Sequence, residues 1–480
     1  MKKVVCFLFL LTGYFTQAQT AGYNISVTIK PYKNQYLYLG YYYGKVKALA
    51  DSALSNSQGV AVFKGAKKLT GGIYFVVSPG KERILFELLL DKQQQFAIVA
   101  DTSNLPASVS YINSADNKLF QNYSRFATEN GQQVSRLASI LPTANPADTA
   151  IINTEIRTLN KKMQQYRDSV TNSNPGSMLA ALLQSLKEPI VPTADKHPGG
   201  KYDSTFAYNY FKSHYWDGVK FTDERLIRTP IFEQKLDKYY KELVIPDPDS
   251  LQKEADAMLT KAKPNKEMFK YLLTYFVQKY INPEYMGQDA VFVHLFEKYI
   301  NNNPQVDWFT EKYKKYMSDR AYSIMGNLIG YTAQNLNLVD TAGTPTPLYK
   351  VNAAYTVIIF WDATCGHCKE VVPKIDSLFQ TKWKQQGVAI YGVMTDGGKA
   401  AWLQYIQQNN LKDWIHVYQT EAQRDAEMNA GKPNYRQLFD VYQTPVLYLL
   451  DANKKILAKK LTWEQINDLL AAKVKAATGK

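Results

Sequence analysis

The feature that most constrains the fold is an uninterrupted apolar run, residues 355–361, followed after a short loop by the pair Cys365 and Cys368. Such a run is typical of a strand buried on both faces of a mixed or parallel sheet. Residues 369–384 then follow a helical pattern, so we expect Cys365 at a helix N-terminus. Unpaired backbone N–H groups and the helix dipole stabilise negative charge there. The sequence therefore predicts an α/β domain with one activated thiol.

The chemistry expected of this pair is thiol–disulfide exchange. A thiolate at Cys365 would attack a disulfide, and Cys368, one turn further into the helix, would resolve the mixed disulfide. His367 lies between them and favours the thiolate, particularly when it is protonated. We expect a redox-active disulfide between Cys365 and Cys368, with no bound cofactor and no metal.

Other uses of a Cys-x-x-Cys pair fit less well. A zinc site needs a second pair or distant histidines, and the chain holds only one further cysteine, Cys6. Lys369 stands where covalent haem attachment requires histidine. Two minority alternatives stay open, a mononuclear copper site that includes His416 and a purely structural disulfide.

A second motif strengthens the redox interpretation. Thr444 and Pro445 begin another buried apolar run, where proline is otherwise disfavoured because it cannot donate to the sheet. A cis bond at Pro445 would present the backbone of Thr444 beside the cysteines. Further elements complete a predicted α/β domain over residues 326–480: strands at 388–394, 446–450 and 455–457, and helices at 399–410 and 463–475.

The first residues are expected to form a secretory signal peptide. A basic start precedes an apolar run at residues 4–11, and Ala18 lies at a position suited to cleavage. We therefore expect residues 1–19 to be removed and the mature chain to be periplasmic or otherwise exported. Loss of Cys6 would leave two cysteines, too close in sequence to stabilise the fold by loop entropy.

Composition narrows the class of protein. Hydrophobic residues make up 45% of the chain and charged residues 21%, as in ordinary globular domains. The net charge is +14, but basic and acidic residues alternate along helical stretches such as 235–242. We therefore expect no nucleic-acid partner, while a peripheral attraction to an anionic envelope surface is compatible with the charge. The oligomeric state is left open.

Two regions precede the α/β domain. Residues 20–110 alternate polar and apolar side chains in short runs separated by turn signals, which predicts an antiparallel β-sandwich-like domain. Residues 111–325 change to helical spacing punctuated by prolines, which predicts an all-α domain. The chain is therefore expected to be multidomain.

The C-terminal motifs together resemble the thioredoxin superfamily. The resemblance rests on a strand end, a Cys-x-x-Cys loop, a proline in the helix and a later Thr-Pro: Phe360-Trp361, Cys365-Gly366-His367-Cys368, Pro373 and Thr444-Pro445. Within the superfamily the region is similar to the TlpA/ResA-like exported branch, whose extra N-terminal strands resemble residues 330–338. The two preceding regions resemble the β domain and helical domain of unassigned function that accompany such domains in some Gram-negative exported proteins.

The resemblance implies roles for single residues. Cys365 would be the nucleophile and Cys368 the resolving thiol. Thr444 and Pro445 would position the substrate and keep metals off the thiols. The active-site motif is completed by Trp361, Gly366 and His367.

Two departures from the family pattern affect the site. Thr364 stands where a tryptophan often precedes the first cysteine, so the substrate groove is expected to differ. Ile359 stands where thioredoxin has a buried aspartate, so the proton acceptor of Cys368 is unassigned. Glu370 is a candidate by its proximity in sequence.

These expectations converge on an exported thiol–disulfide oxidoreductase that exchanges disulfides with protein thiols and draws on a thiol electron donor. A reductase is favoured by the branch, although Gly-His between the cysteines favours a more oxidising pair. A peroxiredoxin is disfavoured because no proline precedes Cys365 at the required spacing. An alternative of another class is a binding or scaffold protein of the cell envelope, with a thioredoxin-like domain that senses redox state.

Overall fold

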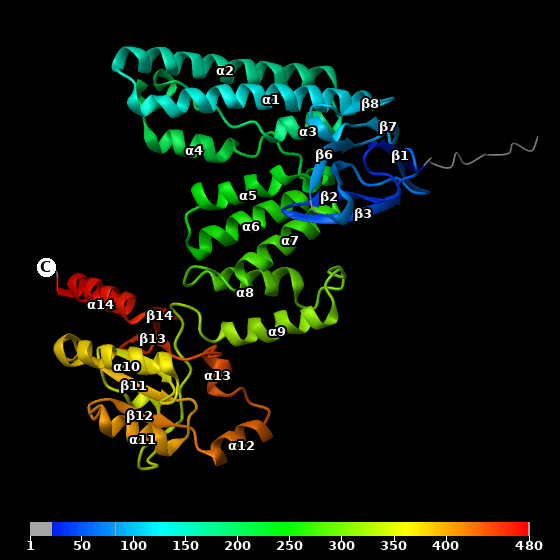
Figure 1. The fold of residues 1–480 in the computed structure, drawn as a ribbon. Helices are drawn as coiled ribbons and strands as arrows, with labels where there is room; N and C mark the ends of the chain where they lie inside the picture. The colour runs from blue at the N-terminus through cyan, green and yellow to red at the C-terminus, as the bar shows by residue number, and fades with distance from the viewer. Residues whose placement is uncertain (1–21, 82, 479–480) are drawn as a thin grey trace, which may run out of the picture. The chain divides into compact units, whose positions relative to one another are not determined.

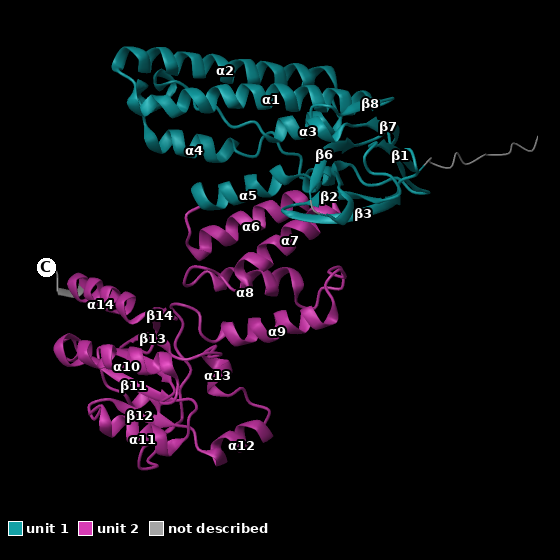
Figure 2. Cartoon of the chain, in the orientation of Figure 1, with its two compact units in different colours: residues 1–243 teal, residues 244–480 magenta. Residues whose placement is uncertain are grey.

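The computed structural model of the chain describes residues 22–81 and 83–478. It divides into two compact units, residues 1–243 and 244–480 (Figure 2). Along the chain β-sheets come first, helices follow and an α/β sheet comes last (Figure 1), which confirms the predicted multidomain fold class. The boundary between the units falls within the helical region, and the predicted domain limits stay predictions. The predicted signal peptide, residues 1–19, lies outside the described residues.

The first unit begins with two four-stranded sheets, ordered β4-β1-β7-β8 and β3-β2-β5-β6. The strands are β1 (Tyr23–Thr28), β2 (Tyr36–Tyr43), β3 (Val46–Leu54), β4 (Val60–Gly65), β5 (Gly72–Val77), β6 (Ile84–Leu90), β7 (Gln95–Val99) and β8 (Ser110–Ile112). Side chains from both sheets, among them Val27, Leu39 and Leu88, share one buried core. The predicted sandwich is therefore present, with one difference: β1 and β7 pair in parallel.

The outer face of the second sheet is covered by helices. Those of the first unit are α1 (Ala115–Ile140), α2 (Pro146–Ser173), α3 (Met178–Ser185), α4 (Ser204–His214) and α5 (Pro230–Glu242). A second core joins Phe75 and Leu89 of this sheet to Phe120 of α1, Met163 of α2 and Leu182 of α3. Strand β5 is thus buried on both faces, as its continuous apolar sequence requires, and so is β6 except at Glu87.

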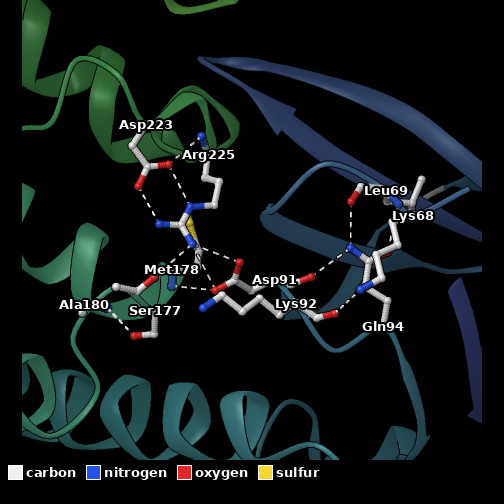
Figure 3. Close-up of polar contacts among 11 residues, drawn as sticks. Lys68, Leu69, Asp91, Lys92, Gln94, Ser177, Met178, Ala180, Asp223 and Arg225 are labelled. Atoms are coloured by element: carbon white, nitrogen blue, oxygen red, sulfur yellow. Dashed lines mark hydrogen bonds and ion pairs between the residues drawn. The ribbon is translucent and has the colours of Figure 1, made fainter. Parts of the chain in front are cut away.

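A charged junction fastens the end of β6 to the helical part of the first unit (Figure 3). The Arg225 guanidinium donates from Nη1 to Asp91 Oδ1 and Oδ2, at 3.0 and 3.1 Å, and from Nη2 to Asp223 Oδ2 at 2.6 Å. Asp91 Oδ2 also accepts from the backbone N–H of Met178, at the start of α3. Asp91 is only 9% exposed, so its charge depends on these partners.

The second unit opens with helices, and side chains cap the starts of three of them. They are α6 (Pro248–Ala262), α7 (Lys266–Tyr280), α8 (Asp289–Leu295), the π-helical turn η7 (Phe296–Ile300) and α9 (Glu311–Met325). Asp247, Asn265 and Thr310 precede α6, α7 and α9, and their side chains accept hydrogen bonds from backbone N–H groups of the first turn. Such caps satisfy donors that have no partner within the helix.

A six-stranded sheet forms the rest of the second unit, in the order β14-β13-β10-β11-β12-β9. Its strands are β9 (Val339–Asp340), β10 (Tyr355–Trp361), β11 (Val388–Met394), β12 (Ile415–Tyr418), β13 (Val446–Asp451) and β14 (Ile456–Lys459). β10 pairs in parallel with β11 and antiparallel with β13. The accompanying helices are α10 (Gly366–Leu378), α11 (Lys399–Gln408), α12 (Glu421–Asn429), α13 (Tyr435–Leu438) and α14 (Trp463–Thr478).

Both faces of this sheet are covered. Ile359 and Trp361 of β10 share a core with α10, α11 and α14, whereas Ile358 and Phe360 share a core with α13 and the lead-in to the sheet. The family resemblance predicts strands at 330–338 in this lead-in. The structure has there an isolated bridge between Thr332 and Lys455, and β9 begins later.

Helices α6–α9 are joined to the sheet by buried charges. Lys459 of β14 donates to Asp289 Oδ2 at 2.6 Å and to Asn327 Oδ1 at 2.8 Å. Asp440, which is 1% exposed, pairs with Arg320 of α9 and with Lys460.

Within the described residues, no helix is long and apolar enough to span a bilayer.

Candidate redox site

The cysteine pair lies between the end of β10 and the first turn of α10. Cys365 occupies the N-cap position of α10 with extended backbone angles, φ −72° and ψ 125°, and Cys368 lies in the first turn. Both carry free thiols, and Cys365 is the more exposed of the two. Pro373 lies within α10, further along the helix. The predicted strand, loop and helix are therefore all present.

The pKa values of the two thiols are shifted in opposite directions. The pKa of Cys365 is lowered, chiefly because the backbone N–H of Cys368 stabilises its sulfur, with further help from the Cys368 and Thr444 side chains. Burial raises the pKa of Cys368 to about 11, in keeping with an exposed fraction of 1%. The accessible sulfur is thus the better nucleophile near neutral pH, because the thiolate is the reactive form.

The segment before β13 closes the site on a second side. The Thr444–Pro445 peptide bond is cis, and the Cys365 thiol donates to the Thr444 carbonyl oxygen at 3.7 Å. Residues far apart in the sequence therefore meet at the nucleophile. Thr444 contacts Cys365 itself, and Pro445 directly precedes the first residue of β13.

Asp362 is a site residue that the sequence interpretation missed. Its backbone N–H donates to Cys368 Sγ at 3.5 Å, and its Oδ1 accepts from both the N–H and the hydroxyl of Thr364, each at 2.7 Å. Gly397 passes so close that a Cβ there would lie 2.3 Å from Asp362 Oδ1. An aspartate followed two residues later by threonine is a turn signal, and it is the clue in the sequence that could have identified this loop.

The remaining predicted residues surround the pair in different ways. Trp361 is fully buried, and its ring packs edge-on against Tyr405, with the ring centres 5.4 Å apart. The side chain of His367 is 67% exposed, and its Nδ1 lies 3.7 Å from Glu370 Oε2. Glu370 is itself 74% exposed and is directed to this histidine. Gly366 borders open space, since a Cβ there would meet no neighbouring group within 4 Å.

The alternative copper site is not assembled. His416 is buried on β12, its Nε2 lies 2.7 Å from the Leu411 carbonyl oxygen, and its ring stacks on Trp414. Over residues 22–81 and 83–478, no group of three or more His, Cys, Asp or Glu side chains could hold a metal ion.

Several solved structures resemble parts of the chain. A domain of a possible thiol-disulfide isomerase from Cytophaga hutchinsonii is 33% identical, covers 32% of this chain and is itself 97% covered, with a TM-score of 0.28. A thioredoxin-like protein from Bacteroides caccae is 20% identical, with coverages of 60% and 99% and a TM-score of 0.44. A thiol:disulfide interchange protein from Bacteroides sp. is 22% identical, with coverages of 32% and 93% and a TM-score of 0.27. No curated protein matches the chain.

Family comparison assigns two regions of the chain. Residues 152–323 match a domain of unknown function, DUF5106. Residues 352–456 match a thioredoxin-like family, and this range contains β10, the cysteine pair, α10 and Pro445. Residues 352–456 of this chain therefore form a thioredoxin-like domain.

Proposed function

We propose that the chain is a thiol–disulfide oxidoreductase that reduces disulfides of protein substrates through Cys365 and Cys368. One observation carries the proposal. Two thiols lie within a single helical turn, and their pKa values are shifted in opposite directions, down at the exposed Cys365 and up to about 11 at the buried Cys368. An attacking thiolate and a protected resolving thiol are the two parts that disulfide exchange needs.

The reaction balances as two successive exchanges. The Cys365 thiolate attacks one sulfur of a substrate disulfide, forms a mixed disulfide and releases the other substrate sulfur as a thiolate that takes up a proton. Cys368 then loses its proton and attacks Cys365 Sγ, which releases the second substrate thiolate. The substrate has gained two electrons, and the Cys365–Cys368 disulfide is reduced again by an external thiol donor.

Electron flow toward the substrate, and a location outside the cytoplasm after removal of residues 1–19, extend the proposal. Both follow from the resemblance to the TlpA/ResA-like branch and from the N-terminal sequence. A reductase requires a pair more reducing than its substrates. We expect a reduction potential below about −200 mV, nearer to that of thioredoxin than to that of a strong periplasmic oxidant.

Insulin reduction tests the activity. With dithiothreitol as donor, the wild type should accelerate the reduction, Cys365→Ser should lose the acceleration entirely, and Cys368→Ser should stall as a mixed disulfide. Cys365→Ser is isosteric, so its folding can be checked by circular dichroism. A wild type that is inert toward insulin and toward every small disulfide would instead support the redox-sensing scaffold.

The pH dependence of alkylation tests the origin of the reactivity. Iodoacetamide should label Cys365 with a midpoint below the ordinary thiol pKa, because the thiolate is stabilised in the folded chain. In Cys365→Ser, labelling of Cys368 should need a higher pH than labelling of Cys365 does, because burial is the largest cause of the raised pKa of Cys368 and is kept in this variant. If Cys365 in the Cys368→Ser variant and Cys368 in the Cys365→Ser variant were labelled with the same pH midpoint, the assigned roles would be contradicted.

A further inference from the structure

A cleft of about 580 Å³ opens beside Pro445 in the second unit. One wall is the segment from Tyr442 through Gln443 to Val446 and belongs to the thioredoxin-like match. The other wall is α9, which lies outside that match and contributes Tyr316, Asp319 and Arg320. The volume lies in the range of ligand sites.

The cleft adjoins the redox centre at Pro445. Pro445 lines it, and the preceding residue, Thr444, places its carbonyl oxygen 3.7 Å from Cys365 Sγ. A polypeptide whose cysteine reacts at Cys365 therefore has its neighbouring residues within reach of the cleft.

The walls are held in place by the buried charges of Asp440. Its carboxylate pairs with Arg320 of α9 and with Lys460, and it accepts from the Ser323 hydroxyl at 3.2 Å. Ser323 also donates to the Gln437 carbonyl oxygen at 3.0 Å. The position of α9 is thereby fixed relative to the chain that leads to Thr444. A cleft with fixed walls needs little ordering when it is filled.

The lining favours an uncharged polypeptide over a charged small molecule. The lining holds two cations, Arg320 and Lys460, and two anions, Asp319 and Asp440, so its formal charge is zero, and both cations pair with Asp440. What the cleft offers instead is aromatic surface, since Tyr442 is 72% and Tyr316 is 44% exposed. Exposed tyrosines combine apolar area with a hydrogen-bonding tip and are enriched where proteins bind partners.

We propose that this cleft binds the polypeptide segment flanking the reacting cysteine of a protein substrate, and that α9 selects segments with apolar or aromatic side chains. The inference rests on the proposed function for its biological meaning. It adds a specificity element that lies outside the thioredoxin-like region.

Binding without thiol chemistry tests the cleft directly. The probe is the insulin B chain with its cysteines carbamidomethylated, titrated calorimetrically into the full chain carrying Cys365→Ser and Cys368→Ser. We expect Tyr442→Ala and Tyr316→Ala, added singly to this background, to raise Kd at least about fivefold each. Tyr322→Ala is the matched control, because Tyr322 is an exposed tyrosine of α9 that does not line the cleft. Equal affinities in all variants, or no binding to the parent, would overturn the proposal.

Kinetics separate this proposal from the proposed function. In the chain with both cysteines, Tyr442→Ala should raise KM for insulin at least about fivefold, whereas the reaction with 5,5′-dithiobis(2-nitrobenzoate) should keep its rate, since that small disulfide needs only Cys365. An inert cysteine pair together with intact B-chain binding would refute the oxidoreductase and leave the cleft standing. A parallel loss with both disulfides would refute the cleft, because damage to the redox loop then explains it.

Discussion

Each unit contains a carboxylate–arginine junction that is largely shielded from water, and the two junctions differ in the chain segment that carries the carboxylate. Asp91 lies just after β6 and pairs with Arg225, among loop residues and the start of α3. Asp440 pairs with Arg320, and the chain runs on from it within a few residues to Thr444, at the Cys365 thiol. The same electrostatic device thus supports folding in the first unit, and in the second it also aligns a reactive loop.

The largest effect is expected from Asp440→Ala. Arg320 is 10% exposed and would keep its charge without a counter-ion, so the free energy of unfolding should fall by about 3–5 kcal/mol. Urea denaturation followed by tryptophan fluorescence reports this unit, because every tryptophan except Trp216 lies in it. Asp440→Asn, which keeps the shape and one acceptor oxygen, should lose less. A loss under about 1 kcal/mol would show that the junction contributes little to stability.

Arg225→Ala should destabilise the first unit by about 3 kcal/mol, since it leaves Asp91 buried beside fewer donors. Hydrogen exchange of peptides from β6 and α3, measured by mass spectrometry, would locate the change. Insulin reduction should keep its rate, because the described contacts of Arg225 all lie within the first unit. Arg225→Lys retains the charge but loses the forked contact, so its stability should lie between those of the wild type and Arg225→Ala. A loss of insulin-reducing activity in Arg225→Ala would break the comparison, because the junction of the first unit is expected to act on stability alone.

Acid should remove the contribution of the second junction. Burial alone would raise the pKa of Asp440, but the hydrogen bond from Arg320 and the charge of Lys460 outweigh it and lower the pKa below 3.8. A carboxylate with a lowered folded-state pKa contributes stability above its unfolded pKa and loses it as pH falls through the folded value. The stability difference between wild type and Asp440→Asn should therefore be constant from about pH 5 to 7 and shrink below about pH 4. A constant difference at all pH values would contradict this.

Lys460→Ala should have the smallest effect, within about 1 kcal/mol, although Lys460 also pairs with Asp440. Its side chain is 40% exposed, and water and salt screen such a charge. Urea denaturation at low and high salt would measure it. If Lys460→Ala lowered the free energy of unfolding as much as Asp440→Ala, exposure to water would not be what limits the contribution of Lys460.

The pattern of apolar residues in the sequence predicted those strands in which the pattern matches the burial of the side chains. β10 and β11 are continuous apolar runs, and β1 alternates, so all three could be predicted directly. β3 has no such pattern, because it is an edge strand with one buried position, and pairing with β2 is what orders it. β12 was missed because it is short, and it depends on β11 and β9 for its hydrogen bonds. Tertiary pairing overrides local preference in such segments.

In the candidate site, the residues that belong to local sequence motifs could be predicted, and the residues buried by tertiary packing could not. The loop with Cys365 and Cys368 is local in sequence, and Thr444-Pro445 carries a motif, so their expected placement needed no knowledge of distant contacts. Asp440 and Arg320 are ordinary surface-type residues in the sequence, and only the packing of α9 on the sheet buries them. Glu370 shows the converse, since closeness in sequence did not bring it to Cys368 but to the exposed side of the helix.

The buried pair of Lys459 and Asp289 has a consequence for modular evolution. Lys459 belongs to the last strand of the sheet and Asp289 begins α8, and both are under 10% exposed. If the sheet were replaced by one without a lysine at this position, Asp289 would be left without its cation. If the sheet were expressed without α8, the Lys459 ammonium group would lose the carboxylate with which it is buried. A recombination that separates the sheet from helix α8 should therefore lower the stability of the second unit, whereas one that moves the helices and the sheet as a block keeps the ion pair intact.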